Sequence, residues 1–195
     1  MGARLLLLRH AQSVWNAEGR WQGWADPVLS PAGEVAAQAA AHDPLLDSVS
    51  GAVASDLQRA RQTAELLADP HGWPAVMTYR GLRERGAGEW TGLTRAEIEK
   101  GWPNSLGGEV VVIPGGESAA AVTARAVASL HRIAADWPGA DVVVVTHGGL
   151  IRLLEAHCGG VPVHVPNLAG RWFHVDGNQL GLGERAGLST TAGVR

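Results

Sequence analysis

The chain has 195 residues, of which 46% are hydrophobic and 18% are charged, which is typical of a globular protein and excludes a disordered one. The formal net charge of −3 gives no overall attraction to nucleic acid or to an anionic membrane, so we expect neither as a partner. The single cysteine, Cys158, excludes an intrachain disulfide, and no apolar run is long enough to span a bilayer. We therefore expect one domain over residues 1–195, located in the cytoplasm.

The first predicted element is a strand that ends in two polar residues. Leu5–Leu8 is an unbroken leucine run, which is typical of a strand buried on both faces of a sheet. Arg9 and His10 follow directly, although a guanidinium and an imidazole are not expected at the end of a core strand. Their position therefore indicates a functional site.

Strands and helices alternate along the rest of the chain. Ser30 is a predicted N-cap with Pro31 in the first helical position, and Ser55 and Asp56 are predicted to cap the next helix. Residues 101–116 are predicted to form a loop, and residues after Gly183 a loosely packed tail. This alternation predicts an α/β fold, a three-layer α/β/α sandwich with a mostly parallel central sheet. The expected elements are helices Pro31–Ala41, Leu57–Leu67, Glu117–Asp136 and Leu150–Cys158, and strands Gly51–Ala54, Val76–Tyr79, Val142–Val145, Trp172–Val175 and Leu180–Leu182.

A second strand repeats the pattern of the first. Val142–Val145 is followed by Thr146, His147 and two glycines, and then by a predicted helix. Ligands of open α/β sheets bind beyond the carboxyl ends of the strands, so neighbouring strands would place His10 and His147 in one crevice. Two glycines at a helix N-terminus allow the backbone to approach a ligand closely and favour an anion.

Two further charged residues fit an anionic ligand. Arg59 lies near the start of a predicted helix, where a cation opposes the helix dipole, and Glu84 lies in a glycine-rich segment between Arg83 and Arg85. Two histidines, arginines and a carboxyl group suit phosphoryl transfer to an imidazole. The arginines balance the phosphate charge, and the carboxyl group protonates the leaving oxygen and later deprotonates water. This chemistry requires no metal and no cofactor.

The sequence resembles the histidine phosphatase (phosphoglycerate mutase-like) superfamily, and its phosphatase branch in particular. Five blocks match in the same order over about residues 5–154: Arg9-His10 with Ser13 and Asn16, then Ser55–Ala64, Leu82–Gly92, Pro114–Ser118 and Thr146–Gly149. The resemblance implies a phosphomonoesterase that forms a phosphohistidine and acts on a small phosphorylated metabolite, such as a phosphoglycerate derivative or a sugar phosphate. It leaves the oligomeric state open, a homodimer included. The implied roles are nucleophile for His10, proton donor for Glu84, phosphate binding for Arg9, Arg59, His147 and Asn16, and substrate contact for Gln22 and Gly23.

The alternative within this family is a cofactor-dependent phosphoglycerate mutase, which the segment Arg20–Gly33 also resembles. Mutases carry a tyrosine where this chain has Ala87, an asparagine at Gly149 and a lysine at Arg95, and they have a longer segment between Glu84 and Glu117. Ala87, Gly149 and the short segment favour the phosphatase, whereas Arg95 in place of lysine keeps some anion binding. A further departure is Ala11, which replaces the usual glycine and should be tolerated unless that position needs a positive φ.

The same residues allow other interpretations of the acid, of the phosphate-binding arginine and of the kind of site. Glu89 and Glu109 compete with Glu84 as the acid, and Arg61 competes with Arg59 but is expected to form a surface ion pair. Glu117 and Ser118 are expected to cap the long helix. Two alternatives belong to other classes of protein. One is a zinc site on His10, His147 and Glu84, which the adjacent arginines disfavour because they repel a cation. The other is a non-catalytic anion-binding protein, which would not need the two groups that handle protons.

Overall fold

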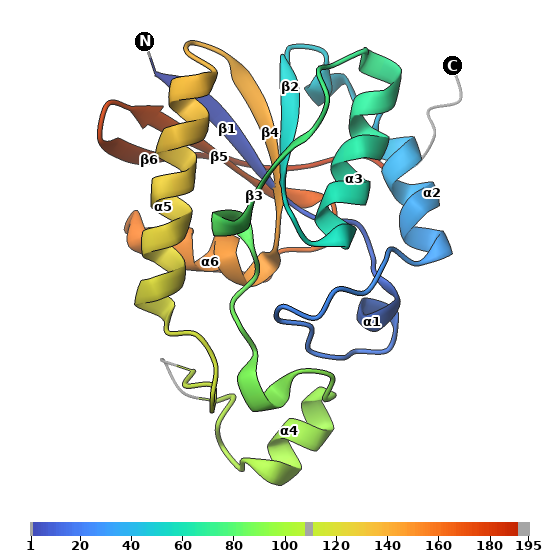
Figure 1. Ribbon diagram of the computed structural model, residues 1–195, viewed down its shortest axis with the longest axis vertical. Coiled ribbons are helices and arrows are strands. Elements are labelled where there is room, and N and C mark those ends of the chain that lie inside the picture. The colour runs from blue at the N-terminus through green and yellow to red at the C-terminus, as the bar shows by residue number, and fades with distance from the viewer. Residues whose placement is uncertain (1, 108–110, 191–195) are drawn as a thin grey trace.

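The computed structural model describes residues 2–107 and 111–190, and a six-stranded sheet runs through its centre (Figure 1). The strand order is β3-β2-β4-β1-β5-β6. The first four strands in this order are parallel, whereas β5 pairs antiparallel with β1 and β6 antiparallel with β5. The strands are β1 (Ala3–Arg9), β2 (Gly51–Ser55), β3 (Met77–Tyr79), β4 (Asp141–Thr146), β5 (Ala169–Asp176) and β6 (Gln179–Gly187).

Helices cover both faces of the sheet, which confirms the predicted three-layer α/β fold (Figure 1). Alternate leucines of β1 point to opposite faces, because successive side chains of a strand alternate. Leu6 and Leu8 pack with residues of α2 and α3, whereas Leu5 and Leu7 pack with residues of α5 and α6. The helices are α1 (Val14–Ala17), α2 (Pro31–Ala40), α3 (Gln58–Ala68), α4 (Arg95–Gly101), α5 (Ala119–Asp136) and α6 (Gly148–His157), with short 3-10 helices at Pro44–Leu46, Asp69–His71, Arg80–Leu82 and Gly88–Trp90.

Serine caps fix the start of two of these helices, as predicted. The Ser30 hydroxyl accepts a hydrogen bond from the amide of Gly33 at 3.0 Å, and Pro31 occupies the first position of α2. The Ser118 hydroxyl accepts from the amide of Ala121 at 3.1 Å and caps α5. These caps place both helices against the sheet with their apolar residues inward.

The predicted cap of α3 is wrong. The helix begins at Gln58, its N-cap position is Leu57, and no side chain caps it. Ser55 ends β2 with its side chain turned to the histidine described below, and Asp56 pairs with Arg83 through two hydrogen bonds of 2.6 and 2.7 Å. The Ser55 hydroxyl also accepts a long bond of 3.4 Å from the amide of Leu57, but the helix itself receives no side-chain cap, because the main partners of Ser55 and Asp56 are distant in sequence.

The predicted loose tail after Gly183 is also wrong. Strand β6 continues to Gly187, and Leu188 is buried, with its amide donating to the carbonyl of Leu168 at 2.9 Å. Gly181 and Gly183 interrupt the apolar pattern that would have indicated a longer strand. A Cβ atom at Gly183 would lie 2.9 Å from the Cβ of Trp172, so the close approach of β5 and β6 favours glycine there.

A small lobe below the sheet was not predicted as such. Helix α4 begins with a capping box in which Thr94 and Glu97 exchange hydrogen bonds, and it precedes the segment predicted to be a loop. Trp90, Ile98 and Ile113 form the buried centre of this lobe, at the lower end of Figure 1. The lobe lies beyond the carboxyl ends of the parallel strands, where the sequence places the site.

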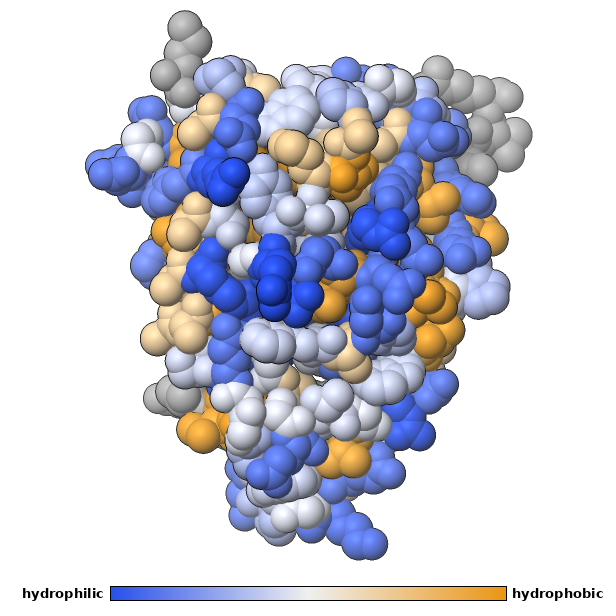
Figure 2. Space-filling model, viewed as in Figure 1, coloured by the Kyte–Doolittle hydropathy of each residue, from blue (hydrophilic) through white to orange (hydrophobic). Residues whose placement is uncertain are grey.

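The surface seen in Figure 2 carries strongly hydrophilic side chains over its middle, between α5 and α3. No helix within the described ranges has the length and apolar character needed to cross a membrane.

Candidate active site

The two strand-end histidines lie together. Strands β1 and β4 are neighbours, with Arg9 opposite Thr146, and the His10 amide donates to the carbonyl of Thr146 at 2.9 Å. The imidazole rings of His10 and His147 have centroids 5.2 Å apart and an interplanar angle of 62°. The two imidazoles that the sequence predicted to meet therefore lie side by side at the carboxyl edge of the sheet.

His10 is held in one tautomer. Its Nδ1 lies 2.7 Å from the carbonyl oxygen of Ala11, and because a carbonyl only accepts, Nδ1 carries the proton and Nε2 keeps its lone pair. Burial, with added repulsion from Arg59 and Arg9, holds the pKa of His10 well below 6.5. The imidazole is therefore neutral at neutral pH, which is the form in which Nε2 is a nucleophile.

Ala11 itself supports this arrangement. It is fully buried, its backbone is outside the positive-φ region, and its amide donates to the Thr63 hydroxyl at 3.0 Å. The departure from glycine at this position is tolerated, as expected.

His147 occupies the N-cap position of α6 and is fully buried. Its Nε2 lies 2.9 Å from the Ser55 hydroxyl, while its Nδ1 has no hydrogen-bond partner among the described residues. Burial and the positive charge of Arg59 hold the pKa of His147 well below 6.5. A buried ring nitrogen without a partner, next to His10, is suited to contact a ligand.

Arg59 is the second residue of α3, as predicted, and is 1% exposed. Its two terminal nitrogens donate to the carbonyls of Ala25 at 2.7 Å and Gly23 at 2.9 Å. Its buried Nε has no hydrogen-bond partner among the described residues. Burial lowers the pKa of Arg59 to about 10, with Glu84 and Asp26 acting in the opposite direction, so the group stays cationic at neutral pH.

Arg9 reaches the same crevice from the end of β1. One terminal nitrogen donates to the carbonyl of Val165 at 2.8 Å, and the chain lies against the N-terminus of α6, where a Cβ at Gly148 would be 3.3 Å from the Arg9 Cδ. Burial lowers the pKa of Arg9, while the charge of Glu84 raises it. Two guanidinium groups therefore face the two imidazoles.

Backbone groups orient the Glu84 carboxyl group. One oxygen accepts from the amide of Arg85 at 2.8 Å and the other from the amide of Gly149 at 3.1 Å. A Cβ at Gly149 would lie 2.4 Å from Oε1 of Glu84, so glycine leaves room for the carboxyl group beside α6. This contact brings the predicted acid to the turn that follows His147.

An arginine that the sequence analysis did not identify holds the segment 81–84, which carries the Glu84 carboxyl group. Arg125 of α5 donates to the carbonyls of Gly81 and Arg83 at 2.8 and 2.7 Å and to that of Glu84 at 2.9 Å. It also forms two hydrogen bonds of 2.8 Å with the carboxylate of Glu117. Glu117 is therefore an ion-pair partner and not the helix cap expected from the sequence.

The remaining predicted residues lie around this centre. The side-chain Oδ1 of Asn16 accepts a hydrogen bond from the Ser13 amide at 3.2 Å and so takes part in the cap of the short α1. The side-chain nitrogen of Asn16 has no partner in the described ranges. Gln22 is buried and accepts from the Ser13 hydroxyl at 2.9 Å. Gly23 has a positive φ of 48° and contributes its carbonyl to Arg59. Asn16 is thus available to a ligand, while Gln22 and Gly23 also hold the loop in place.

The segment before β5 fixes the end of β1, which the sequence did not indicate. Asn167 donates to the carbonyl of His10 at 2.7 Å, and the amide of Leu168 donates to the carbonyl of Arg9 at 2.9 Å. Together with the bond from Arg9 to Val165, these contacts hold both residues at the strand end.

The structure places the alternative acid Glu89 and the alternative arginine Arg61 outside the cluster around His10 and His147. Glu89 is exposed, and Arg61 forms the expected surface ion pair with Glu65 at 3.0 Å, four residues along α3. Glu109 lies outside the described residues. Glu84 is the acid candidate that reaches the turn after His147.

Electrostatics disfavour the zinc interpretation. Burial and, after it, the positive charge of Arg59 lower the pKa of both His10 and His147, and that positive charge would also repel a metal cation. Within residues 2–107 and 111–190, no group of three or more histidine, cysteine, aspartate or glutamate side chains is arranged to hold a metal.

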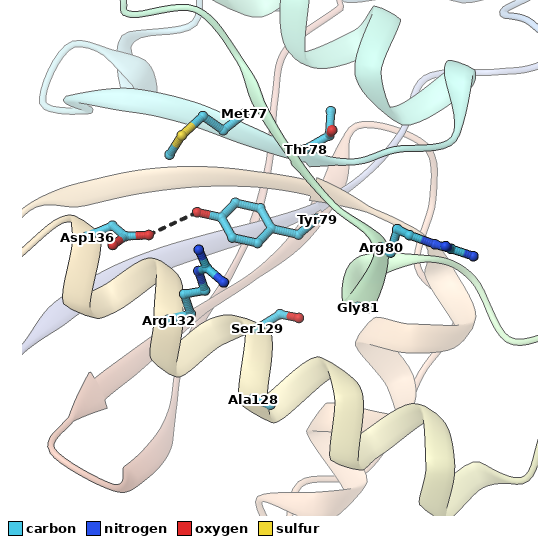
Figure 3. Close-up of a pocket in the computed structure, with 9 residues that line it drawn as sticks. All are labelled: Met77, Thr78, Tyr79, Arg80, Gly81, Ala128, Ser129, Arg132 and Asp136. Atoms are coloured by element: carbon cyan, nitrogen blue, oxygen red, sulfur yellow. Dashed lines mark hydrogen bonds between the residues drawn. The ribbon is translucent and has the colours of Figure 1, made fainter.

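A separate groove of about 480 Å³ lies between β3 and α5 (Figure 3). The Tyr79 hydroxyl donates to Asp136 at 3.1 Å, and Arg132 extends toward the tyrosine ring, whereas Arg80 extends away from it. Burial and Asp136 raise the pKa of Tyr79. The two cations of this groove do not converge, and no histidine lines it, so it is not the candidate site.

Comparison with known proteins agrees with the fold. A profile described as the histidine phosphatase superfamily (branch 1) matches residues 5–176. A glucosyl-3-phosphoglycerate phosphatase of Mycolicibacterium vanbaalenii is 39% identical over 82% of this chain and 76% of its own length. A 2,3-bisphosphoglycerate-dependent phosphoglycerate mutase of Gloeobacter violaceus is 34% identical over 78% of this chain and 74% of its own. The structure of a mycobacterial glucosyl-3-phosphoglycerate phosphatase in complex with VO3 superposes with a TM-score of 0.79 and 32% identity, covering 95% of this chain and 98% of the other.

These findings define an α/β enzyme of the phosphoric monoester hydrolase class. The profile covers more than half of the chain, and the relatives exceed 30% identity over most of their length. The chain belongs to the histidine phosphatase superfamily, branch 1.

Proposed function

We propose that this enzyme hydrolyses a small phosphorylated metabolite through a phosphohistidine on His10. The observation that carries the proposal is the free Nε2 of His10 beside three groups with hydrogen-bonding capacity for an anion. These are Arg9, Arg59 with its unpartnered Nε, and His147 with its unpartnered Nδ1. A phosphoryl group placed among them would satisfy the buried donors and have its charge balanced.

In the first step, Nε2 of His10 attacks phosphorus and the bond to the ester oxygen breaks. The protonated carboxyl group of Glu84 donates its proton to that oxygen, so the alcohol leaves neutral. Arg9 and Arg59 stabilise the charge on the non-bridging oxygens as it develops. The Ser55 hydroxyl can donate to Nε2 of His147, which leaves a proton on Nδ1 for the phosphoryl group.

In the second step, water attacks the phosphohistidine. The Glu84 carboxylate takes a proton from that water, the phosphorus–nitrogen bond breaks, and inorganic phosphate leaves with neutral His10 restored. The amides of Arg85 and Gly149 keep the carboxyl group in place for both proton transfers.

Two positions favour hydrolysis over mutase activity. Ala87, where mutases carry tyrosine, is buried and lines an open pocket, so this chain lacks the side chain that would fill that space. At Gly149, where mutases carry asparagine, any Cβ would contact the Glu84 carboxyl group in its present position. The site therefore differs from a mutase site at two residues: Gly149 lies beside the Glu84 carboxyl group, and Ala87 lines the pocket.

Gly149→Ala is expected to lower kcat for an alkyl phosphate by about 10²-fold, because the added methyl displaces the Glu84 carboxyl group from its proton-transfer position. The effect on 4-nitrophenyl phosphate should be much smaller, since nitrophenolate leaves without a proton. Steady-state assays of both esters measure the difference. Gly101→Ala, with no atom within 4 Å of the added Cβ, is the matched control; equal alkyl phosphate rates for the two variants would contradict this role of Gly149.

The proposed function is tested by measuring phosphate release from a panel of metabolites in EDTA, including 3-phosphoglycerate with and without 2,3-bisphosphoglycerate. We expect phosphate to be released at the same rate with and without the chelator. Conversion of 3-phosphoglycerate to 2-phosphoglycerate that depends on the bisphosphate would instead establish the mutase. Binding of phosphate esters without turnover would establish the anion-binding protein.

A further inference from the structure

A second pocket opens beside the acid. It has a volume of about 350 Å³, and both Glu84 and Gly149 line it. Because Glu84 is the proposed donor to the leaving oxygen, the alcohol part of a substrate bound at His10 extends toward this pocket. Its lining therefore bears on which alcohol the enzyme accepts.

Most of this pocket is apolar. Its wall combines the small lobe with one face of α6, and three of its residues, Gly23, Ala87 and Ile113, are buried. Among the described lining residues there is no serine, threonine, asparagine, glutamine, tyrosine, histidine or aspartate. A polyol would lose water at its hydroxyl groups and would find no neutral polar side chain of these types there, only the charged groups at Glu84, Arg85 and Arg152. The apolar side chains are those of Trp21, Ala87, Val111, Ile113, Ala119, Leu153, Ala156 and Pro162.

Two arginines interrupt the apolar lining, and they differ in what they already contact. Arg85 donates through Nε to the carbonyl of Glu117 at 2.7 Å and through a terminal nitrogen to the carbonyl of Val111 at 3.0 Å. Arg152 has no hydrogen bond or ion pair with any residue in the described ranges, and it is exposed. Arg85 is thus part of the wall, whereas the guanidinium of Arg152 is free to bind a ligand at the rim.

The geometry of α6 directs Arg152 to the same pocket. Gly149, Arg152, Leu153 and Ala156 all line it and have the spacing of one helix face. Arg152 lies one turn beyond Gly149, whose amide holds the Glu84 carboxyl group. Neighbours at this spacing have Cβ positions about 5–6 Å apart, so an anionic group of the alcohol can reach Arg152 while its ester oxygen lies at Glu84.

We propose that the substrate is the phosphate monoester of an alcohol that has an apolar body and a carboxylate, with Arg152 binding that carboxylate. This inference rests on the proposed function, since it places the phosphoryl group at His10. An arginine fork pairs with a carboxylate through two parallel hydrogen bonds, and the apolar wall covers the body between the two charged ends. The pocket disfavours unsubstituted sugar and polyol phosphates.

The test uses three phosphate esters: those of 4-(hydroxymethyl)benzoate and of its primary amide, which differ in charge but hardly in size, and glycerol 3-phosphate. We expect kcat/KM for the carboxylate to exceed that for the amide by about tenfold, as one charge-assisted pair allows, and both to exceed that for glycerol 3-phosphate. In Arg152→Gln the carboxylate-to-amide ratio should fall to about 1. Arg132→Gln, an exposed arginine on another helix, should keep the wild-type ratio.

Two results would overturn this assignment. One is a wild-type enzyme that hydrolyses the carboxylate and amide esters equally well, and the other is an Arg152→Gln variant that keeps the wild-type ratio. Failure of the proposed function is distinguishable, because in that case none of the three esters would release phosphate.

Discussion

Replacing His10 with alanine is expected to lower kcat/KM for phosphomonoester hydrolysis by at least about 10⁴-fold, because no other group can take the phosphoryl group from the bound ester. His10 is the ring whose Nε2 is left free by the bond from Nδ1 to the Ala11 carbonyl. Wild-type enzyme quenched in alkali during turnover of a ³²P-labelled ester should retain label, since a phosphorus–nitrogen bond survives alkali and is lost in acid. The variant should retain none.

A matched control separates chemistry from folding in this experiment. His71 also has a ring nitrogen 2.7 Å from a backbone carbonyl, that of Ala41, but it lies away from the site and stacks on Trp73. His71→Ala should keep both turnover and labelling. Circular dichroism should show folded protein for both variants, since backbone pairing fixes β1. A folded His10→Ala enzyme that hydrolyses esters at the wild-type rate would contradict the nucleophile assignment.

Glu84→Gln is expected to lower kcat for alkyl phosphates by about 10²- to 10⁴-fold, the usual contribution of a general acid. The amide cannot protonate an alkoxide, but 4-nitrophenolate leaves without help, so the first step with 4-nitrophenyl phosphate should remain fast. The second step lacks its base. A stopped-flow trace with this ester should therefore show a burst of nitrophenolate, of about one equivalent per enzyme, followed by slow turnover.

Glu89→Gln is the control for this variant, because Glu89 is an exposed carboxylate in the same segment. It should behave like the wild type with both esters. Equal losses on alkyl and nitrophenyl phosphates in Glu84→Gln, without a burst, would indicate that the residue binds substrate and does not transfer the proton.

The parts of this molecule that follow local rules could be predicted from the sequence. Uniform leucine and valine runs give β1 and β4, since only central strands are buried on both faces. The carboxyl ends of parallel strands meet at one edge, so residues that directly follow such strands lie close together. This reasoning predicts His10 and His147 in one place, and the position of Arg59 near a helix start predicts its role with an anionic ligand.

The parts of the molecule that depend on partners distant in sequence could not be predicted from the sequence. Arg125 lies in the middle of a helix and has the pattern of a surface charge, yet its partners are the carbonyls of a segment about 40 residues earlier. Ser55 has the sequence pattern of a helix cap, but its hydroxyl bonds to His147, 92 residues away. Such bonds depend on how the helices and strands pack together, and this packing cannot be predicted from a single sequence.

The contacts that hold the end of β1 have a consequence for how the enzyme is made. Strand β1 is synthesised first, but its sheet neighbours are β4 and β5, and Arg9 and His10 are fixed by Val165 and Asn167, some 156 residues later. A ribosome-bound chain that lacks these residues has every catalytic group of the proposal, and Ala11 and Thr146 can still bond to His10, but the contacts from Val165 and Asn167 are missing. We therefore expect full activity only after Val165, Asn167 and β5 have been synthesised and have packed against β1.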